Sequence, residues 1–301
     1  MREVTFKYIT AAATAAAEGK APEPKAYTGR LLACWPVKGT RMFSVETAAG
    51  ERNFREDRLT IESALELDPV LTAVFDGSPK VLTLAGLVPI NSVPIGLGLV
   101  TEKPLEDLVF GCVDLETTGL FPWGKDKGGN PVAPDRITEF GIVQGKLTGD
   151  TIEYSTLLYP QRKLHPDAAA LTGMTDDQLL LCPSFDQMAE HISCVLKTCD
   201  VVVAHYAPFE QGFLASEFQR ARVPVPDMLM LDTCVMAKKN GGFTSNKQGA
   251  VAAALGIAYK GDAHRAISDA QVCMQLIRKF LEVCIAKGDK TLGDVIKRYA
   301  E

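Results

Sequence analysis

The stretch Val113-Asp114-Leu115-Glu116-Thr117-Thr118-Gly119 decides the expected fold of the region around it. Apolar residues at 108–110 precede it and a glycine ends it, which predicts a buried strand that runs into a turn. Because side chains alternate along a strand, Asp114 and Glu116 point to the same face. Two buried neighbouring carboxylates repel each other and lose hydration, and a hard divalent cation relieves both costs. The alternative is an exposed acidic strand end, the more common meaning of an isolated Asp-x-Glu.

Composition bounds the class of protein. The 301 residues are 47% hydrophobic and 23% charged, as in ordinary globular proteins, and are enough for two domains or one large one. The net charge of −5 excludes a broadly basic nucleic-acid binder, so an anionic substrate must be attracted by local patches or by metal. The eight cysteines are scattered without a Cys-x-x-Cys pair, which indicates reduced thiols and a cytoplasmic location. We expect neither a membrane span nor a signal peptide.

The chain divides into three parts by pattern. Residues 1–61 hold short alternating runs and predict a small β-rich, barrel-like domain. Residues 62–107 mix apolar residues with Pro and Gly, and we interpret them as a connector packed on its neighbours. Residues 108–301 alternate strands with helices, which predicts an α/β domain with a mixed sheet and helices on both sides. Its expected strands begin near residues 108, 137, 151, 201 and 228.

Further acidic residues follow the later strands. Glu210 lies on the first turn of the helix after strand 201–204, and Asp232 ends the strand at 228–231. His264 stands where a loop enters a helix, with Asp269 about one turn deeper. Carboxylates at strand ends and helix starts can converge at one sheet edge. That is the requirement for two metal ions roughly 3.5–4 Å apart that clamp a phosphodiester. We interpret Asp232 as a turn cap or an orienting group.

Three motifs in this order resemble the DEDDh 3′–5′ exonuclease family, which includes proofreading subunits, ribonuclease T, oligoribonuclease and the TREX nucleases. They are Asp-x-Glu-Thr-Thr-Gly at 114–119, His-x-Ala-x-Phe-(acid) at 205–210 and His-x-Ala-x-x-Asp at 264–269. The resemblance covers about residues 108–284. It implies a ribonuclease H-like fold, a mixed five-stranded sheet flanked by helices, and an exonuclease domain over 108–301.

The resemblance also implies roles for single residues. Asp114, Glu116, Glu210 and Asp269 match the ligands of two Mg²⁺ or Mn²⁺ ions, and His264 matches the general base. An unperturbed histidine titrates near pH 6.5, which suits that role. Substrate contacts are expected at Thr117, Thr118, Gly119, Leu120, His205, Tyr206 and Phe213, with ordinary packing or turn chemistry as the alternative for each. For His205 we favour support of the site over metal binding, and for Phe213 we favour packing.

The chain departs from the family pattern at two positions. Glu210 stands where the family usually has aspartate, and Tyr206 replaces the usual asparagine. The extra methylene of Glu210 shifts the shell of the second metal, and the phenol of Tyr206 can stack on a base. The loop at 121–134 is longer than its turn requires. With Trp123 and two lysines, it is either a mobile flap near the substrate or a solvated loop.

Two stretches of the N-terminal part resemble the WYL domain, a small barrel that in its family binds nucleic acid or nucleotide-like ligands. They are Phe6-Lys7-Tyr8 and residues 52–59, whereas Met42-Phe43-Ser44 stands where the Trp-Tyr-Leu signature would be. Arg52, Arg55 and Arg58 either bind such a ligand or line a solvated strand edge with a local ion pair to Glu56 or Asp57.

The expected activity is release of nucleoside 5′-monophosphates from the 3′ ends of single-stranded or short DNA or RNA, as in proofreading or DNA repair. The acidic net charge favours such substrates over a long duplex. The alternatives are a nucleic-acid-binding module with a weakened active site and a polymerase-accessory subunit. DNA against RNA, and a monomer against a homodimer, stay open.

Overall fold

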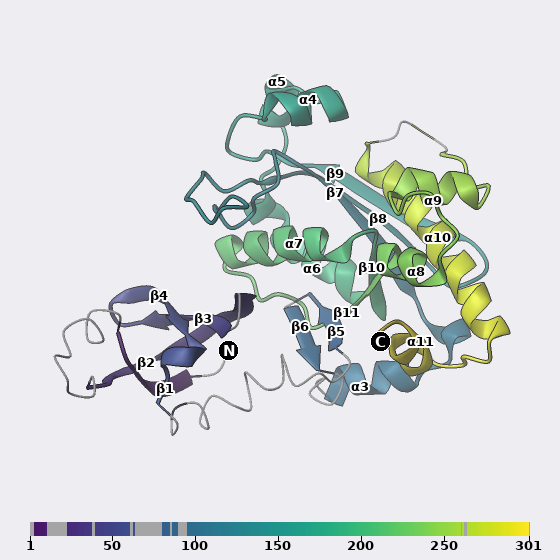
Figure 1. Cartoon of the computed structure of the whole chain (residues 1–301). Coiled ribbons are helices and arrows are strands. Elements are labelled where there is room, and N and C mark those ends of the chain that lie inside the picture. The colour runs from purple at the N-terminus through teal and green to yellow at the C-terminus, as the bar shows by residue number, and fades with distance from the viewer. Residues whose placement is uncertain are drawn as a thin grey trace. The chain divides into compact units, whose positions relative to one another are not determined.

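The computed structural model describes residues 3–10, 23–37, 40–60, 63, 80–84, 86–89, 95–259, 261 and 264–300. The chain forms two compact units, residues 1–78 and 79–301 (Figure 1). The boundary therefore falls after Ser78, well before the position near 107 that the sequence pattern indicated. Most of the expected connector between 62 and 79 lies outside the described residues.

The N-terminal unit is the antiparallel sheet that the alternating runs predicted. Its strands β1 (Glu3–Tyr8), β2 (Lys25–Val37), β3 (Thr40–Thr47) and β4 (Gly50–Arg55) pair in sequence order. After the 3₁₀ turn η1 (Glu56–Arg58) the chain returns to β1. There the amide of Ile9 donates to the carbonyl of Arg58 (2.9 Å) and that of Thr60 to Lys7 (3.2 Å). The two edges of the sheet thus approach each other through this segment.

Aromatic side chains fill the inside of the N-terminal sheet. Phe6, Phe43 and Phe54 are buried, and their rings meet at centroid distances of 4.7–5.5 Å. On β1 the exposed residues alternate with the buried ones, as expected for a sheet with one wet face. Arg55 pairs with Asp57 at 2.8 Å, so for this arginine the local ion pair is present.

The C-terminal unit contains a seven-stranded mixed sheet in the order β6-β5-β11-β10-β7-β8-β9. The five strands expected from the sequence are all present: β7 (Phe110–Thr117), β8 (Ile137–Gly145), β9 (Thr151–Leu157), β10 (Val201–Ala204) and β11 (Leu229–Asp232). Strands β7, β10 and β11 are parallel, β8 is antiparallel to β7, and β9 is antiparallel to β8. The prediction of five strands was too low by two, because β5 (Lys80–Thr83) and β6 (Gly86–Pro89) extend the sheet beyond β11.

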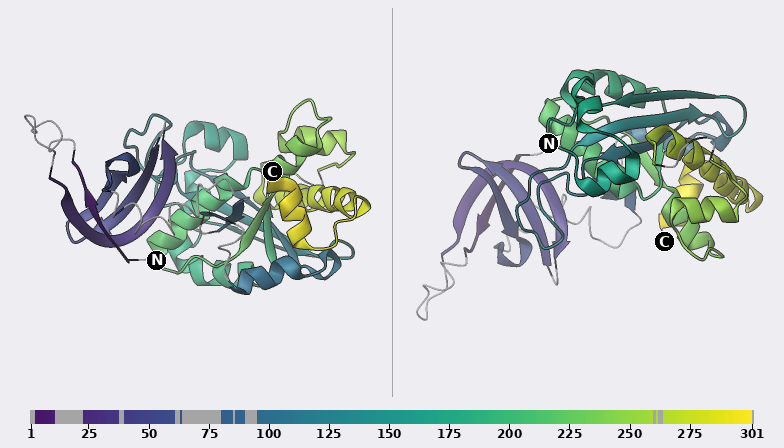
Figure 2. Two further views of the ribbon diagram at one scale, coloured as in Figure 1. Left: turned by 60° about the horizontal axis from the view of Figure 1, so that its bottom comes forward. Right: turned by 90° about the horizontal axis from the view of Figure 1, so that it is seen from above.

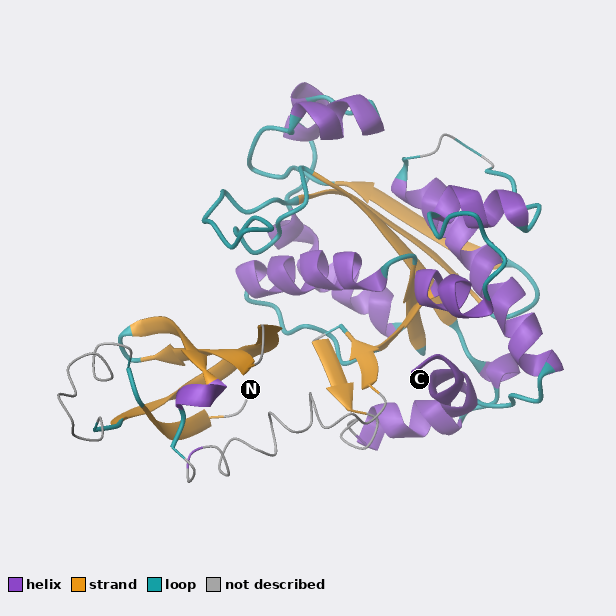
Figure 3. Cartoon of the chain, in the orientation of Figure 1, coloured by secondary structure: helices purple, strands orange, loops and turns teal. Residues whose placement is uncertain are grey.

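Helices cover both faces of this sheet (Figures 1 and 2). On one face pack α6 (Phe185–Lys197) and α7 (Ala207–Ala221), and on the other α8 (Thr233–Asn240), α9 (Gln248–Ala254) and α10 (Ala266–Ala286). Alternation along β7 supplies both cores, since Cys112 faces the α10 side and Val113 the α6 side. The described part of the unit also contains the helices α3 (Ile95–Glu102), α4 (Pro166–Thr172), α5 (Asp176–Leu180) and α11 (Leu292–Ala300) (Figure 3).

Local sequence explains where the main helices begin. Ser184 and Gln187 form a capping box at the start of α6. Asp232 caps α8 by accepting hydrogen bonds from the amides of Cys234 (2.8 Å) and Val235 (3.3 Å). Helix α10 buries the apolar stripe predicted from its spacing. In the described ranges, no helix combines the length and apolarity needed to cross a bilayer.

Candidate active site

The carboxyl ends of three parallel strands place the acidic residues at one sheet edge. Asp114 and Glu116 lie on β7, and Asp232 is the last residue of β11. Glu210 stands on the first turn of α7, which follows β10, and Asp269 on the first turn of α10. The segments are far apart in the sequence, yet ligand atoms of Glu116, His264 and Asp269 lie within 4.8 Å of one another.

The carboxylates interact electrostatically. Burial raises the pKa of Asp114 well above its usual range, and the charges of Glu210, Asp269 and Glu116 add to the rise. Burial, with the charges of Asp269 and Glu139, raises the pKa of Glu116 to about 8. Burial also raises the pKa of Glu210, with Asp232 and Glu116 adding to it. The fold therefore gathers Asp114, Glu116, Glu210 and Asp269, as the sequence motifs require.

These side chains fit a divalent cation. Oε2 of Glu210 is buried without a hydrogen-bond partner among the described residues. Within the same ranges, no arginine or lysine pairs with Asp114, Glu116 or Glu210, although the last two are only 8% and 4% exposed. Buried anions without partners are costly, and a hard cation with oxygen ligands removes that cost. The cluster is thus a candidate metal centre.

Asp269 also fixes the loop that carries His264. Its Oδ2 accepts the backbone N–H of His264 (2.9 Å), and its Oδ1 accepts the Tyr259 hydroxyl (2.9 Å) and Gln248 Nε2 (3.3 Å). His264 has a left-handed backbone with φ of 64° and an exposed side chain. Because a non-glycine residue seldom adopts this conformation, the contacts of Asp269 help to hold it.

An ion pair with a buried glutamate holds Arg265, the residue next to His264. Arg265 donates from Nε and Nη2 to the two oxygens of Glu139, each at 3.0 Å, and Glu139 is completely buried on β8. The amide of Ala266 also donates to Glu139 (3.3 Å). Gly141 lets α10 approach closely, because a Cβ there would lie 2.5 Å from the carbonyl carbon of Ala266. Strand β8 thereby fixes the start of α10, beside His264.

His205 is held inside the protein by both ring nitrogens. Nε2 lies 2.7 Å from the carbonyl oxygen of Asn246, to which it donates, and Nδ1 lies 3.0 Å from Thr233 Oγ1. Burial lowers its pKa, in keeping with a neutral ring. These contacts fit the supporting role that we favoured for His205. Tyr206, in contrast, is 57% exposed in a left-handed conformation, and its amide donates to Asp232 (3.0 Å).

Two other expected substrate contacts are buried. Phe213 is fully buried and packs against Phe209, so it offers no surface to a substrate. Thr118 is also fully buried, and its hydroxyl donates to Asp135 (2.9 Å) and accepts the amide of Arg136 (3.0 Å). Direct contact is therefore excluded for the Thr118 side chain, and the burial of Phe213 agrees with the packing role that we favoured for it.

The remaining residues of the turn are accessible in part. The Thr117 hydroxyl donates to the carbonyl of Gly119 (2.6 Å), and Leu120 is 60% exposed. A Cβ on Gly119 would lie 2.6 Å from a carboxylate oxygen of Asp135, so only glycine fits there without rearrangement. Leu120 and Tyr206 keep the accessible surface that substrate contact would need.

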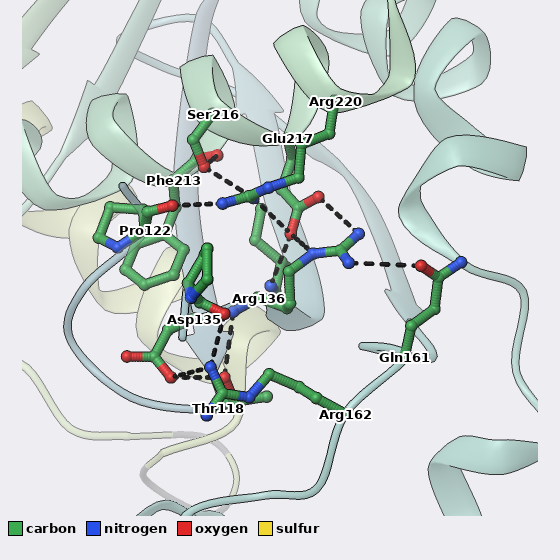
Figure 4. A network of polar contacts seen from close by, with 12 residues as sticks. Thr118, Pro122, Asp135, Arg136, Gln161, Arg162, Phe213, Ser216, Glu217 and Arg220 are labelled. Carbon is green, nitrogen blue, oxygen red and sulfur yellow. Dashed lines mark hydrogen bonds and ion pairs between the residues drawn. The ribbon is translucent and has the colours of Figure 1, made fainter. Parts of the chain in front are cut away.

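The loop at 121–134 is clamped at its base (Figure 4). Asp135 accepts from the amide of Phe121 (2.9 Å) and pairs with Arg162 (3.0 Å), which also donates to the carbonyl of Pro134 (2.5 Å). Arg220 of α7 donates to the carbonyl of Pro122. The mobile-flap interpretation therefore does not hold for the base of this loop. Trp123 remains 53% exposed.

Arg220 belongs to a buried charge network on α7. Glu217 is completely buried and binds Arg136 through two contacts, at 2.6 and 2.9 Å, while Arg220 lies 3.5 Å away (Figure 4). The sequence pattern predicts no role for Glu139, Glu217 or Arg265. Their only signal was a charged residue inside or beside an apolar segment.

Comparison with known proteins agrees with this geometry. The exonuclease family model RNase_T matches residues 112–277. The chain is 32% identical over 174 residues to the DNA polymerase III subunit epsilon of Treponema pallidum, covering 57% of this chain and 75% of that protein. It is 31% identical over 199 residues to a Mycobacterium tuberculosis protein named as a candidate bifunctional exonuclease/endonuclease, covering 64% of this chain. The match spans 30% of the length of that second relative.

Among solved structures, exonuclease X in complex with 5′ overhanging duplex DNA superposes with a TM-score of 0.47 at 18% identity. The match covers 62% of this chain and 99% of that one. A converging set of acids at one sheet edge is the arrangement of metal-dependent phosphodiester hydrolases, and the family match assigns the domain to the exonucleases. The chain belongs to the DEDDh 3′–5′ exonuclease family.

Proposed function

We propose that this protein is a metal-dependent exonuclease that removes nucleotides from the 3′ end of single-stranded or short nucleic acid, releasing nucleoside 5′-monophosphates. The observation that carries the proposal is the proximity of Glu116, Asp269 and His264, whose ligand atoms lie within 4.8 Å of one another. The family match supports the reaction class.

Asp114, Glu116, Glu210 and Asp269 would hold two Mg²⁺ or Mn²⁺ ions. When bound, such ions lower the pKa of an attacking water and stabilise the leaving 3′ oxygen. His264 would take the proton from the water, and its exposed side chain on a fixed backbone suits that transfer. Leu120 would pack against the terminal base, with Thr117 and Gly119 beside its sugar.

The test is a digestion panel. Labelled single-stranded DNA, duplex DNA, short RNA and structured RNA are incubated with the protein and Mg²⁺ or Mn²⁺. We expect 5′-mononucleotides from single-stranded 3′ ends, and no cleavage by Asp114→Ala. Equal cleavage by that variant, or products that start from the 5′ end, would refute the proposal.

A polymerase-accessory role is the second candidate, because a relative that the chain covers to 75% is named as a DNA polymerase III subunit. Co-purification with a polymerase would support this role. A homodimer is tested by light scattering of the full chain.

A further inference from the structure

A groove of about 430 Å³ opens between three segments of the C-terminal unit. It is bounded by His205 and Tyr206 before α7, by Cys234 on α8, and by residues 245–248 at the start of α9. Its size is within the range of small-molecule sites. No sequence motif drew attention to residues 245–248.

The groove shares hydrogen-bonded residues with the carboxylate cluster. Gln248, in its wall, donates from Nε2 to Oδ1 of Asp269 (3.3 Å) and to the carbonyl of the same residue (2.8 Å). At the other side, the Tyr206 amide is bound to Asp232, whose charge reaches Glu210. The groove therefore lies beside the cluster, linked to it through Gln248 and Asp232.

Hydrogen bonds within the protein hold the residues that line the groove in place before a ligand binds. The carbonyl of Asn246 accepts from His205 (2.7 Å) and from the thiol of Cys234 (3.6 Å), which joins the loop to β10 and α8. The backbone conformation of Tyr206 is held by Asp232. A preformed groove loses little conformational freedom when a ligand binds.

The groove offers the two chemistries that a nucleotide needs. The phenol ring of Tyr206 is 57% exposed, and an accessible aromatic face is a stacking platform for a base. Lys247 is exposed at the rim, and Lys238 on α8 lies close enough for its charge to act on both His205 and Cys234. Two ammonium groups suit a phosphodiester.

We propose that this groove binds the nucleotide next to the one being removed, with its phosphate on Lys247 and its unpaired base on Tyr206. The inference rests on the proposed function and specifies its substrate. Because the face of Tyr206 can receive only an unstacked base, the groove selects single-stranded ends and gives no base-specific readout.

The first experiment measures turnover of a single-stranded hexanucleotide and of the p-nitrophenyl ester of thymidine 5′-monophosphate, which carries one nucleotide. For Tyr206→Ala and Lys247→Ala we expect the ratio of kcat/KM, hexanucleotide to ester, to fall about 5-fold or more and about 3-fold, respectively. Lys197→Ala removes an exposed lysine from α6, on the opposite face of the sheet, and keeps the wild-type ratio. An unchanged ratio in both groove variants overturns the proposal.

The second experiment needs no catalysis, so it separates the groove from the proposed function. Fluorescence anisotropy reports binding of the labelled hexanucleotide to the Asp114→Asn protein at several salt concentrations. Adding Lys247→Ala should weaken binding and reduce the slope of log K against log salt by about 0.7, the loss of one phosphate contact. The same slope with and without Lys247 overturns the groove even if the enzyme is active. A reduced slope supports it even if no substrate is cleaved.

Discussion

Two groups of buried acidic side chains in the C-terminal unit have opposite surroundings. Glu139 and Glu217 are completely buried, and each binds an arginine through two hydrogen bonds. Glu116 and Glu210 are nearly as buried, yet no described basic side chain pairs with them. Glu116 and Glu139 even face each other across β7 and β8. These facing positions thus differ in whether an arginine binds the carboxylate directly, since Arg265 binds Glu139 and reaches Glu116 only through its charge.

The role of a buried carboxylate can be inferred from whether the protein supplies a basic partner for it. A paired one holds elements together, as Glu139 holds the start of α10 and Glu217 holds Arg136. An unpaired one destabilises the fold by itself and is tolerated where a ligand completes it. The contrast therefore separates positioning residues from candidate metal ligands without reference to motifs.

The largest expected effect is on activity at an unpaired site. Asp114→Asn should reduce exonuclease activity to below about one-thousandth of the wild-type rate, because a carboxylate ligand of the proposed metal ions is lost. The metal-free variant should be at least as stable as the wild type, since a repelling buried charge is removed. Urea unfolding and product release measure the two quantities. A large loss of stability would contradict the view that the unpaired Asp114 carboxylate destabilises the metal-free fold.

For the paired glutamates we expect the main effect on stability rather than on activity. Glu217→Ala leaves Arg136 buried without its partner, and we expect a loss of about 3–5 kcal/mol in the free energy of unfolding. Glu139→Ala should cost less, roughly 2–3 kcal/mol, because Arg265 is 43% exposed. It should nevertheless lower kcat more than Glu217→Ala does, since it releases the residue beside His264. The comparison fails if the Glu139 variant keeps full kcat.

Stability should depend on pH and metal together. The pKa of Glu116 is about 8 in the metal-free fold against an ordinary 4.5, so the folded state binds more protons than the unfolded state between these values. The stability of the metal-free protein must therefore fall as pH rises from 4.5 to 8. We expect a decrease of about 5 °C or more in Tm in EDTA, and recovery with Mn²⁺. Calorimetry at pH 5.5 and 8.0 measures this. A Tm that rises across this window would contradict it.

The smallest effect is expected from Glu210→Asp. Shortening the side chain by one methylene restores the usual family residue but moves the carboxylate within a buried site. We expect activity within about tenfold of the wild type and a shift in the ratio of Mg²⁺- to Mn²⁺-supported rates. Metal titrations of both proteins check this. An unchanged ratio would mean that the length of Glu210 does not set metal choice.

The sequence predicted the five central strands and the gathering of the acids because periodic hydrophobicity and spaced motifs act locally. It did not predict β5 and β6, since a short apolar run between prolines has no strand signal until β11 offers an edge. It did not predict that the Thr118 side chain is buried, because burial depends on what packs over a residue. It also missed the arginine partners of Glu139 and Glu217, which lie 126 and 81 positions away.

The hairpin of β5 and β6 determines where a fragment that contains only the nuclease domain should begin. A fragment cut at residue 108, where the alternating pattern starts, would strip the outer edge of β11 and leave Leu229 to Leu231 ready to pair with other molecules. A fragment that begins at residue 79 keeps this edge covered. A fusion protein that contains this nuclease domain must therefore include the hairpin.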